Sequence, residues 1–229
     1  MYLYELHCHT QETSRCGLIS AKDLVKYYHK LGYSGICITD HFLNGNTIVP
    51  HDLPWEERIT QFIKGYQAAK ETGDKLGMDV FFGWEYSFWG TDFLTYGLDE
   101  NWLYNNPDCL KWRVSEYCDR VHQDGGFIVH AHPFREANYI EMIRLMPRHV
   151  DGVEVINACR LDFENKLADQ YAYNYNLLKT ASSDNHEGRI PRIAAMEFSE
   201  RKRSIHEVIE GIKKGEAKLR LFNIEELEK

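Results

Sequence analysis

Apolar runs and amphipathic stretches alternate along the whole chain. Residues 1–4 have the pattern of a strand. Ser20 is a suitable N-cap for an amphipathic helix at 21–31, which ends at Gly32. Residues 35–39 then form a short apolar run that is typical of a strand covered on both faces. A strand, a helix and a second strand in this order predict a βαβ unit with parallel pairing.

The same alternation continues towards the C-terminus. Further helices are expected at 55–76, 110–123, 137–146, 162–176 and 205–214, and further strands at 78–82, 93–97, 127–129, 152–156, 178–181 and 193–198. The patterns also predict loops at 42–54 and 101–108, and a solvated tail after 214. About seven strand–helix units predict an α/β fold whose parallel sheet can close into a barrel. Because linkers, repeats and low-complexity tracts are absent from the sequence, we expect a single domain over residues 1–229.

Composition narrows the class of protein. The chain has 229 residues, and its hydrophobic fraction of 43% is enough for a sizeable core. The sequence has neither an apolar run of membrane-spanning length nor a basic-then-apolar signal, so neither membrane insertion nor export is expected. Six scattered cysteines without CxxC spacing fit a reducing cytosol and predict a cytoplasmic protein. The net charge of −8 argues against nucleic-acid binding through a basic surface.

Histidines and carboxylates cluster at the predicted strand ends. His7 and His9 lie two residues apart on a strand, so they point to the same face. Four later motifs each follow an apolar run: Thr39-Asp40-His41, Gly83-Trp84-Glu85, His130-Ala131-His132-Pro133 and Asp184-Asn185-His186. The C-terminal ends of parallel strands meet at one end of a barrel, which is where such folds place their chemistry. The sequence therefore predicts a metal site at the C-terminal strand ends.

Imidazoles and carboxylates are the ligands that zinc, manganese and iron accept. The candidate metal ligands are His7, His9, His41, Glu85, His132, Asp184 and His186. This set is too large for one four-coordinate ion and suits two or three ions, with Glu85 and Asp184 as the better bridging carboxylates. Clusters of this kind activate water and clamp the oxygens of a phosphoester. We therefore expect a metal-dependent hydrolase that acts on a small phosphate mono- or diester through metal-activated water.

Individual roles follow from this expectation. Asp184, His186 and Glu85 are the expected catalytic residues. The arginines that follow motif segments are candidates to hold phosphate oxygens, with ordinary exposed loop arginines as the alternative: Arg15, Arg135 and Arg160. Two other functions stay open: a metal-dependent amide or lactone hydrolase on the same kind of barrel, and a degenerate barrel used only for binding. The sequence contains no GxSxG motif, P-loop or GxGxxG after a strand.

Taken together, the motifs resemble the PHP (polymerase and histidinol phosphatase) superfamily, from residue 3 to about residue 200. The resemblance rests on His7-x-His9, Thr39-Asp40-His41, Gly83-Trp84-Glu85, Ala131-His132-Pro133 and Asp184-x-His186. It implies a distorted (βα)7 barrel, up to three metal ions and phosphoesterase activity. It also implies that His7, His9, Glu85 and Asp184 hold one ion, that Glu85 and His132 hold a second, and that His41 and His186 hold a third.

Two positions depart from the family pattern. Members commonly place an acid, His or Gln in the loop after the first motif, where this chain has Cys16. Members also often carry a His on the strand after the Glu, whereas residues 92–96 contain none. The candidates for an additional ligand, or for a side chain that orients a ligand, are therefore Cys16, Asp40, Asp92 and His130. The alternative is that fewer than three ions are bound.

Overall fold

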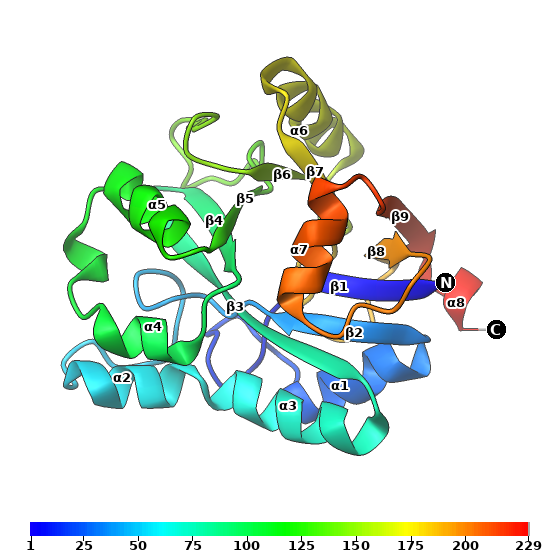
Figure 1. Ribbon diagram of the computed structural model, residues 1–229, viewed down its shortest axis with the longest axis horizontal. Helices are drawn as coiled ribbons and strands as arrows, with labels where there is room; N and C mark the ends of the chain where they lie inside the picture. The colour runs from blue at the N-terminus through cyan, green and yellow to red at the C-terminus, as the bar shows by residue number, and fades with distance from the viewer. Residues whose placement is uncertain (229) are drawn as a thin grey trace.

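The computed structural model describes residues 1–228, and their strands form one curved sheet (Figure 1). In sequence order the strands are β1 (Tyr2–Cys8), β2 (Tyr33–Ile38), β3 (Asp79–Phe88), β4 (Thr91–Tyr96), β5 (Phe127–Ala131), β6 (Gly152–Asn157), β7 (Leu178–Ser182), β8 (Arg192–Phe198) and β9 (Lys218–Asn223). Their order across the sheet is β7-β6-β5-β4-β3-β2-β1-β8-β9. The backbone N–H of Ala194 in β8 donates to the Ser183 hydroxyl just after β7 (2.9 Å), so the barrel is nearly closed.

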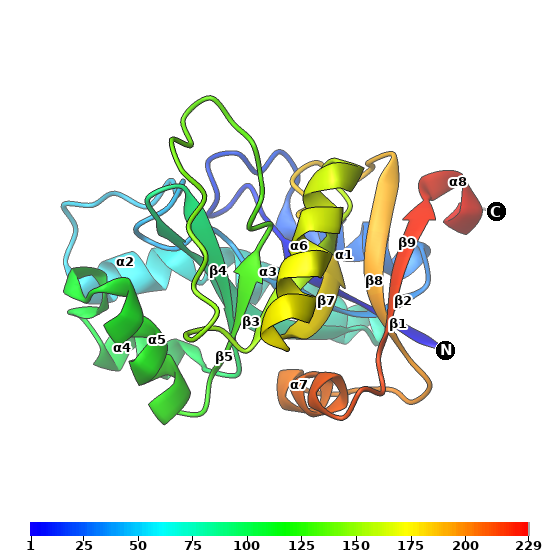
Figure 2. The same cartoon turned by 90° about the horizontal axis from the view of Figure 1, so that it is seen from above.

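Helices surround this sheet on several sides. They are α1 (Ala21–Lys30), α2 (Trp55–Phe62), α3 (Lys64–Leu76), α4 (Glu100–Asn105), α5 (Val114–Gln123), α6 (Asp162–Tyr175), α7 (Ile205–Lys213) and α8 (Ile224–Leu227). The α6 helix lies alongside β7, and β8 and β9 lie side by side at an edge (Figure 2). The α7 helix buries Val208, Ile209 and Ile212 in a core that contains Phe127 at the start of β5. This helix therefore covers the barrel end from which β5 begins.

The predicted opening βαβ unit is confirmed. The Ser20 side chain caps α1 by accepting a hydrogen bond from the Asp23 backbone N–H, and Leu24 and Tyr28 are buried. The flanking strands β1 and β2 pair in parallel, with Glu5 opposite Ile36. The beginning of the chain thus follows its hydrophobic pattern closely.

The expected all-parallel (βα)7 sheet is wrong, because the sheet is mixed. The β4 strand is antiparallel to both β3 and β5, and β8 is antiparallel to both β1 and β9. Only Trp89 and Gly90 separate β3 from β4, and both have positive φ values (49° and 80°). A two-residue connection of this kind joins antiparallel strands and leaves no room for a helix.

Four helix or loop predictions are also corrected. The helix expected at 55–76 is interrupted at Ile63. The helix expected at 110–123 is divided into a 3₁₀ turn, Cys109–Lys111, and α5, which begins only at Val114. The loop expected at 101–108 contains most of α4, because Asp99 caps it and Trp102 is buried. Residues 137–146 form no helix, and most of them are exposed or only partly buried, so no apolar stripe holds one in place.

The expected solvated tail also contains regular structure. Lys218 and Arg220 are exposed, whereas Leu219 and Phe222 are partly buried, as expected of an edge strand. Lys229 lies outside the described residues. None of the helices in residues 1–228 combines the length and the apolar character needed to span a bilayer.

Candidate metal centre

The seven predicted ligands come from five chain segments and gather at one place. His7 lies on β1 and His9 directly follows it, and the other histidines and Asp184 follow β2, β5 and β7. Glu85 departs from the expectation because it lies within β3, which continues to Phe88. Three groups of side chains offer ligand atoms that lie within 4.8 Å of one another: His7, Glu85 and His132; His7, His9 and Asp184; and His9, His41 and His186. These groups contain all seven predicted ligands.

Two carboxylates form the middle of this cluster. Glu85 Oε1 lies 3.4 Å from His7 Nε2 and 3.1 Å from His132 Nε2. Asp184 Oδ1 lies 3.5 Å from His7 Nε2 and 3.4 Å from His9 Nε2. Two nitrogen or oxygen ligands of one tetrahedral zinc ion lie about 3.4 Å apart, since each is about 2.1 Å from the metal. The spacing of these side chains therefore fits shared metal ions.

Unusual backbone conformations direct two of the ligands into the cluster. His132 and Asp184 have φ values of 25° and 56°, in the region that few non-glycine residues adopt. His130 would share a face with His132 on a regular strand. The turn at His132 instead separates them, and His130 Nε2 contacts Thr91 Oγ1 (2.7 Å) while its ring stacks on Phe93. The His130 side chain therefore packs against residues of β4 and belongs to none of the three ligand groups.

Carboxylate and hydroxyl partners orient two of the imidazoles. His7 Nδ1 donates to Glu154 Oε1 (2.9 Å), because an ionised carboxylate can only accept. Ser14 donates its hydroxyl proton to Asp40 (2.7 Å) and accepts from the His41 backbone N–H (3.0 Å). Its remaining lone pair faces His9 Nδ1 at 3.2 Å, so that nitrogen is the donor. The Nε2 atoms of His7 and His9 are thereby left to face the cluster.

These Nε2 atoms require a positive charge between them. They lie 3.1 Å apart, too close for two lone pairs without a proton or a cation. Burial lowers the pKa of His7, but Asp184, Glu154 and Glu85 outweigh this effect and raise the pKa well above its usual value. Burial also raises the pKa of Glu85, yet His41 and His7 hold it well below its usual range. A proton on His7 therefore balances the carboxylates when no ion is bound, and a divalent cation fits the same role.

One further contact of the cluster also fits a cation. Glu85 Oε2 and His41 Nδ1 lie 2.5 Å apart, so these two buried groups form an ion pair that raises the pKa of His41. Together with the carboxylates, these atoms make the donor set suitable for divalent transition metals.

Metal binding is expected to release protons, and its affinity is expected to rise with pH. The raised pKa of His7 means that this imidazole carries a proton at neutral pH when no ion is bound. A cation needs the lone pair that this proton occupies, so binding must displace the proton. Titration calorimetry with Zn²⁺ in two buffers of different ionisation enthalpy measures the release. Equal heats in the two buffers would contradict this assignment.

Sequence reasoning missed Glu154, which is fully buried in the middle of β6. Besides His7, its carboxylate accepts from the backbone N–H of His132 (2.9 Å), from the Asn157 side chain (2.9 Å) and from the Ser182 hydroxyl. It thus connects two candidate ligands and orients both. An ionisable residue inside the apolar run Gly-Val-Glu-Val-Ile was the signal that could have identified it.

Replacing Glu154 with Gln is expected to weaken Zn²⁺ binding about 10- to 100-fold, the usual cost of removing a group that orients a ligand. The amide has a single acceptor oxygen, so it cannot serve all of the donors that the carboxylate serves. Zinc affinity against a competing chelator measures the effect. Glu197→Gln is the matched control, because Glu197 is a buried carboxylate that pairs with Arg220 on β9. Equal zinc affinity in Glu154→Gln and the wild type would refute this role.

The remaining candidate residues differ in how close they lie to the cluster. Cys16 Sγ is 3.1 Å from His41 Nε2. Burial raises the pKa of this thiol, but hydrogen bonds with His186 and His41 lower it to about 6. The Asp40 carboxylate accepts hydrogen bonds from Thr10 and Ser14, and its backbone carbonyl accepts from the Glu85 N–H (3.1 Å). Asp92 Oδ2 pairs with Arg135 (3.3 Å) next to the cluster.

Two cavities open onto this cluster. One, of about 490 Å³, has Cys16, His41, His186, Asp92 and Arg135 in its lining. Another, of about 290 Å³, adds Arg160 and Asp184. Of the three arginines predicted to bind phosphate, Arg135 and Arg160 line cavities at the cluster. The exposed Arg15 lines neither cavity, and it donates to the Thr47 carbonyl oxygen (3.2 Å).

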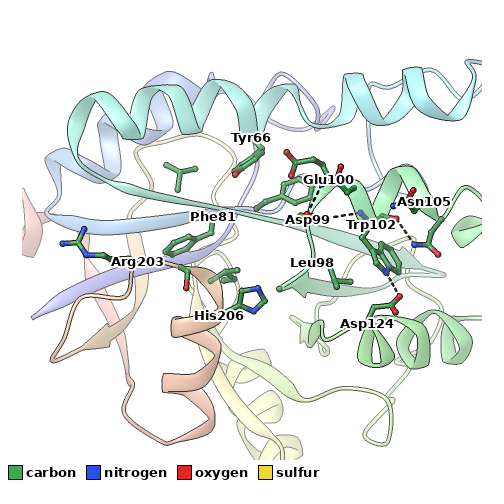
Figure 3. Close-up of a pocket in the computed structure, with 17 residues that line it drawn as sticks. Tyr66, Phe81, Leu98, Asp99, Glu100, Trp102, Asn105, Asp124, Arg203 and His206 are labelled. Carbon is green, nitrogen blue, oxygen red and sulfur yellow. Dashed lines mark hydrogen bonds between the residues drawn. The ribbon is translucent and has the colours of Figure 1, made fainter.

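A larger cavity, of about 740 Å³, lies at the other end of the barrel (Figure 3). Phe81 near the start of β3, Asp124 before β5 and His206 on α7 are among the residues that line it. Asp99 and Asp124 already accept hydrogen bonds from Trp102, and none of the predicted site residues is present. The size of the cavities alone would therefore have pointed away from the ligand cluster that the motifs predict.

Comparison with known proteins identifies the family. The family model of the PHP domain matches residues 5–220, and the chain therefore belongs to the PHP family. Structural neighbours include proteins described as predicted or putative metal-dependent phosphoesterases, and at 17% identity they show the same fold. No curated protein matches the chain.

Individual solved structures resemble the fold at low sequence identity. A two-domain protein from Bacteroides vulgatus, which contains a predicted PHP-like metal-dependent phosphoesterase, has a TM-score of 0.73 and 17% identity, over 97% of this chain and 65% of that one. This chain thus spans about two thirds of that neighbour's length. PsfC from Pseudomonas syringae has a TM-score of 0.63 and 15% identity, over 99% and 93% of the two chains. An amidohydrolase from Chromobacterium violaceum, with bound sulfate and no metal, has a TM-score of 0.58 and 14% identity, over 80% and 87%.

Proposed function

We propose that the chain is a metal-dependent phosphoesterase that hydrolyses a small phosphate mono- or diester. The observation that supports this proposal most strongly is the arrangement of five imidazoles around two buried carboxylates, Glu85 and Asp184. Seven such side chains exceed the needs of one four-coordinate ion and suit a cluster of two or three. Membership of the PHP family agrees with this reading.

Each ion would have its own ligands in this proposal. His7, His9, Glu85 and Asp184 would hold the first ion, Glu85 with His132 the second, and His41 with His186 the third. His9 also lies within 4.8 Å of the last pair, but its one free nitrogen, Nε2, serves the first ion. When bound, such ions activate water and neutralise the charge that develops on a phosphoryl group. Manganese, zinc and iron all suit this donor set.

The chain's own residues orient the substrate and the ligands. Arg135 is held by Asp92, and its Nε is buried without a hydrogen-bond partner among residues 1–228. Arg160 Nε is likewise buried without a hydrogen-bond partner among residues 1–228. Both arginines line the small cavity that contains Asp184, so each can donate to a phosphate oxygen placed there. Behind the ligands, Glu154 and Ser14 fix the imidazole orientations that the ions require.

A substrate screen of the metal-loaded protein tests this proposal. Purified protein, loaded separately with Mn²⁺, Zn²⁺ and Fe²⁺, is assayed against panels of phosphomonoesters, phosphodiesters, lactones and amides. The proposal predicts hydrolysis of phosphoesters that is lost after chelation and restored by added metal. Hydrolysis of lactones or amides alone would favour the other hydrolase class. Tight metal binding without hydrolysis of any panel would favour a barrel that only binds.

A further inference from the structure

The segment that joins β5 to β6 projects beside α6 (Figure 2), and it encloses a cavity of about 700 Å³ with the start of that helix. This volume is within the range of about 300–1,000 Å³ that small-molecule sites occupy. Three apolar side chains in its lining are more than half exposed: Met142 (57%), Ile143 (51%) and Leu161 (60%). Exposed apolar side chains around a cavity are typical of a site that an apolar ligand covers.

Arg135 connects this cavity to the metal centre. It lines the 700 Å³ cavity and also both cavities that contain candidate metal ligands. Ile140, in the same lining, packs against the turn between β3 and β4, because a Cβ at Gly90 would lie 3.4 Å from Ile140 Cγ1. Gly90 in turn lines the 490 Å³ cavity, so the two cavities are neighbours. An ester whose phosphate contacts Arg135 can therefore extend its organic group into the 700 Å³ cavity.

The charges around this cavity oppose a second anionic group. Three carboxylates line it, and Arg135 is the one basic residue among the described residues of the lining: Glu136, Glu141 and Glu164 are the acids. Glu164 is buried and accepts the backbone N–H of Glu136 (2.7 Å), whereas the Glu136 and Glu141 side chains are exposed. A second phosphate or a carboxylate on the organic group would lie beside these acids, and such juxtaposition of like charges is unfavourable.

We infer that the organic group of the substrate is apolar, carries no negative charge, and binds in the cavity between residues 137–143 and the start of α6. This inference rests on the proposed function and adds the class of substrate to it. The substrate is an alkyl or aryl phosphoester, whereas bisphosphates and phosphorylated carboxylic acids are disfavoured. Arg135 lies between the two parts of the site, with the phosphate on one side and the organic group on the other.

The hydrolysis of n-alkyl phosphates by the Mn²⁺-loaded protein tests the inference. The leaving alcohols of ethyl, butyl and hexyl phosphate have nearly the same acidity, so differences in kcat/KM report binding of the chain. Since a fully buried methylene contributes about 4-fold, kcat/KM for hexyl phosphate is expected to exceed that for ethyl phosphate by at least about 10-fold. A six-carbon phosphate ester that ends in a carboxylate is expected to have a kcat/KM at least about 10-fold below that of hexyl phosphate.

Two variants of the same segment locate the effect. Ile143→Asn places a polar side chain in the cavity lining, and it is expected to lower the hexyl-to-ethyl ratio of kcat/KM by at least about 3-fold. Leu145→Asn is the matched control, because Leu145 is also exposed (39%) but is not among the described residues that line the cavity. Its ratio should equal that of the wild type. A wild-type ratio in Ile143→Asn would overturn the inference, because the chain would then bind elsewhere.

Binding measurements separate this inference from the proposed function. Alkylphosphonates have a carbon–phosphorus bond in place of the ester, and titration calorimetry with the Mn²⁺-loaded protein measures their affinity without hydrolysis. Hexylphosphonate is expected to bind at least about 10-fold more tightly than ethylphosphonate. Equal affinities, or equal kcat/KM across the phosphate series, would overturn the apolar site and leave phosphoester hydrolysis unaffected. Preferential binding of hexylphosphonate without hydrolysis of any ester would refute the proposed function and support the apolar site. Binding of neither phosphonate would refute both.

Discussion

Asp184→Asn is expected to abolish phosphoester hydrolysis and to reduce the metal content of the protein. Asp184 Oδ1 faces both His7 and His9, and the amide that replaces it carries no charge to attract a cation. The rate of hydrolysis should fall by more than the roughly 10²- to 10³-fold that removal of a single electrostatic contact from an active site costs. Asn is preferred to Ala here because Asn, like Asp, tolerates the left-handed backbone at φ 56°. Steady-state kinetics and elemental analysis of the same preparation measure both effects.

The matched control for this experiment is Asp169→Asn. Asp169 is an exposed carboxylate that pairs with Lys179 (2.6 Å), away from the metal centre. Its removal should change neither hydrolysis nor metal content, since exposed ion pairs contribute little. If Asp184→Asn retained the wild-type rate, Asp184 would not be a ligand of the catalytic ions and the proposed mechanism would fail.

Trp84→Ala is expected to lower the free energy of unfolding by about 3–5 kcal/mol, the usual cost of truncating a buried Trp or Phe. Trp84 is fully buried next to Glu85, and its ring stacks on Trp102 with 5.7 Å between centroids. Its indole N–H donates to the Tyr117 hydroxyl (2.6 Å), so the substitution removes a hydrogen bond as well as apolar contacts. Urea denaturation followed by circular dichroism measures the change in stability.

Trp89→Ala provides the comparison for this loss of stability. Trp89 lies in the turn between β3 and β4, and 77% of its surface is exposed. Its truncation should change the free energy of unfolding by no more than about 0.5 kcal/mol, as is usual for surface positions. Equal destabilisation by the two substitutions would mean that Trp84 does not hold β3, and with it Glu85, in the way described.

The motifs predicted which side chains gather in the cluster, because most of them directly follow buried strands. His9, His41, His132 and His186 each come a few residues after an apolar run, and strand ends are easily recognised from hydrophobic patterns. The end of β3 was less evident, since this ten-residue strand continues through Glu85 into an aromatic segment. Glu85 nevertheless reaches the cluster, because its side chain faces His7 and His132 from the strand itself.

Other features could not be read from local patterns. The turn at Trp89 and Gly90 lacks the Asn-Gly pair that marks most two-residue hairpins, so the antiparallel β4 was not expected. His130 and His132 share a face in a regular strand, and only the backbone turn at His132 separates them. Glu154 contacts His7 across 147 residues of sequence, and this long-range contact exists only in the folded chain.

The central claim is that these side chains hold metal ions together, and anomalous X-ray scattering from zinc-soaked crystals tests it most directly. Strong anomalous peaks are expected within coordination distance of Glu85, Asp184 and the surrounding histidines, with at least two peaks sharing a carboxylate. Zinc bound only at other positions, or no peak among His7, Glu85, His132 and Asp184 at saturating zinc, would contradict it.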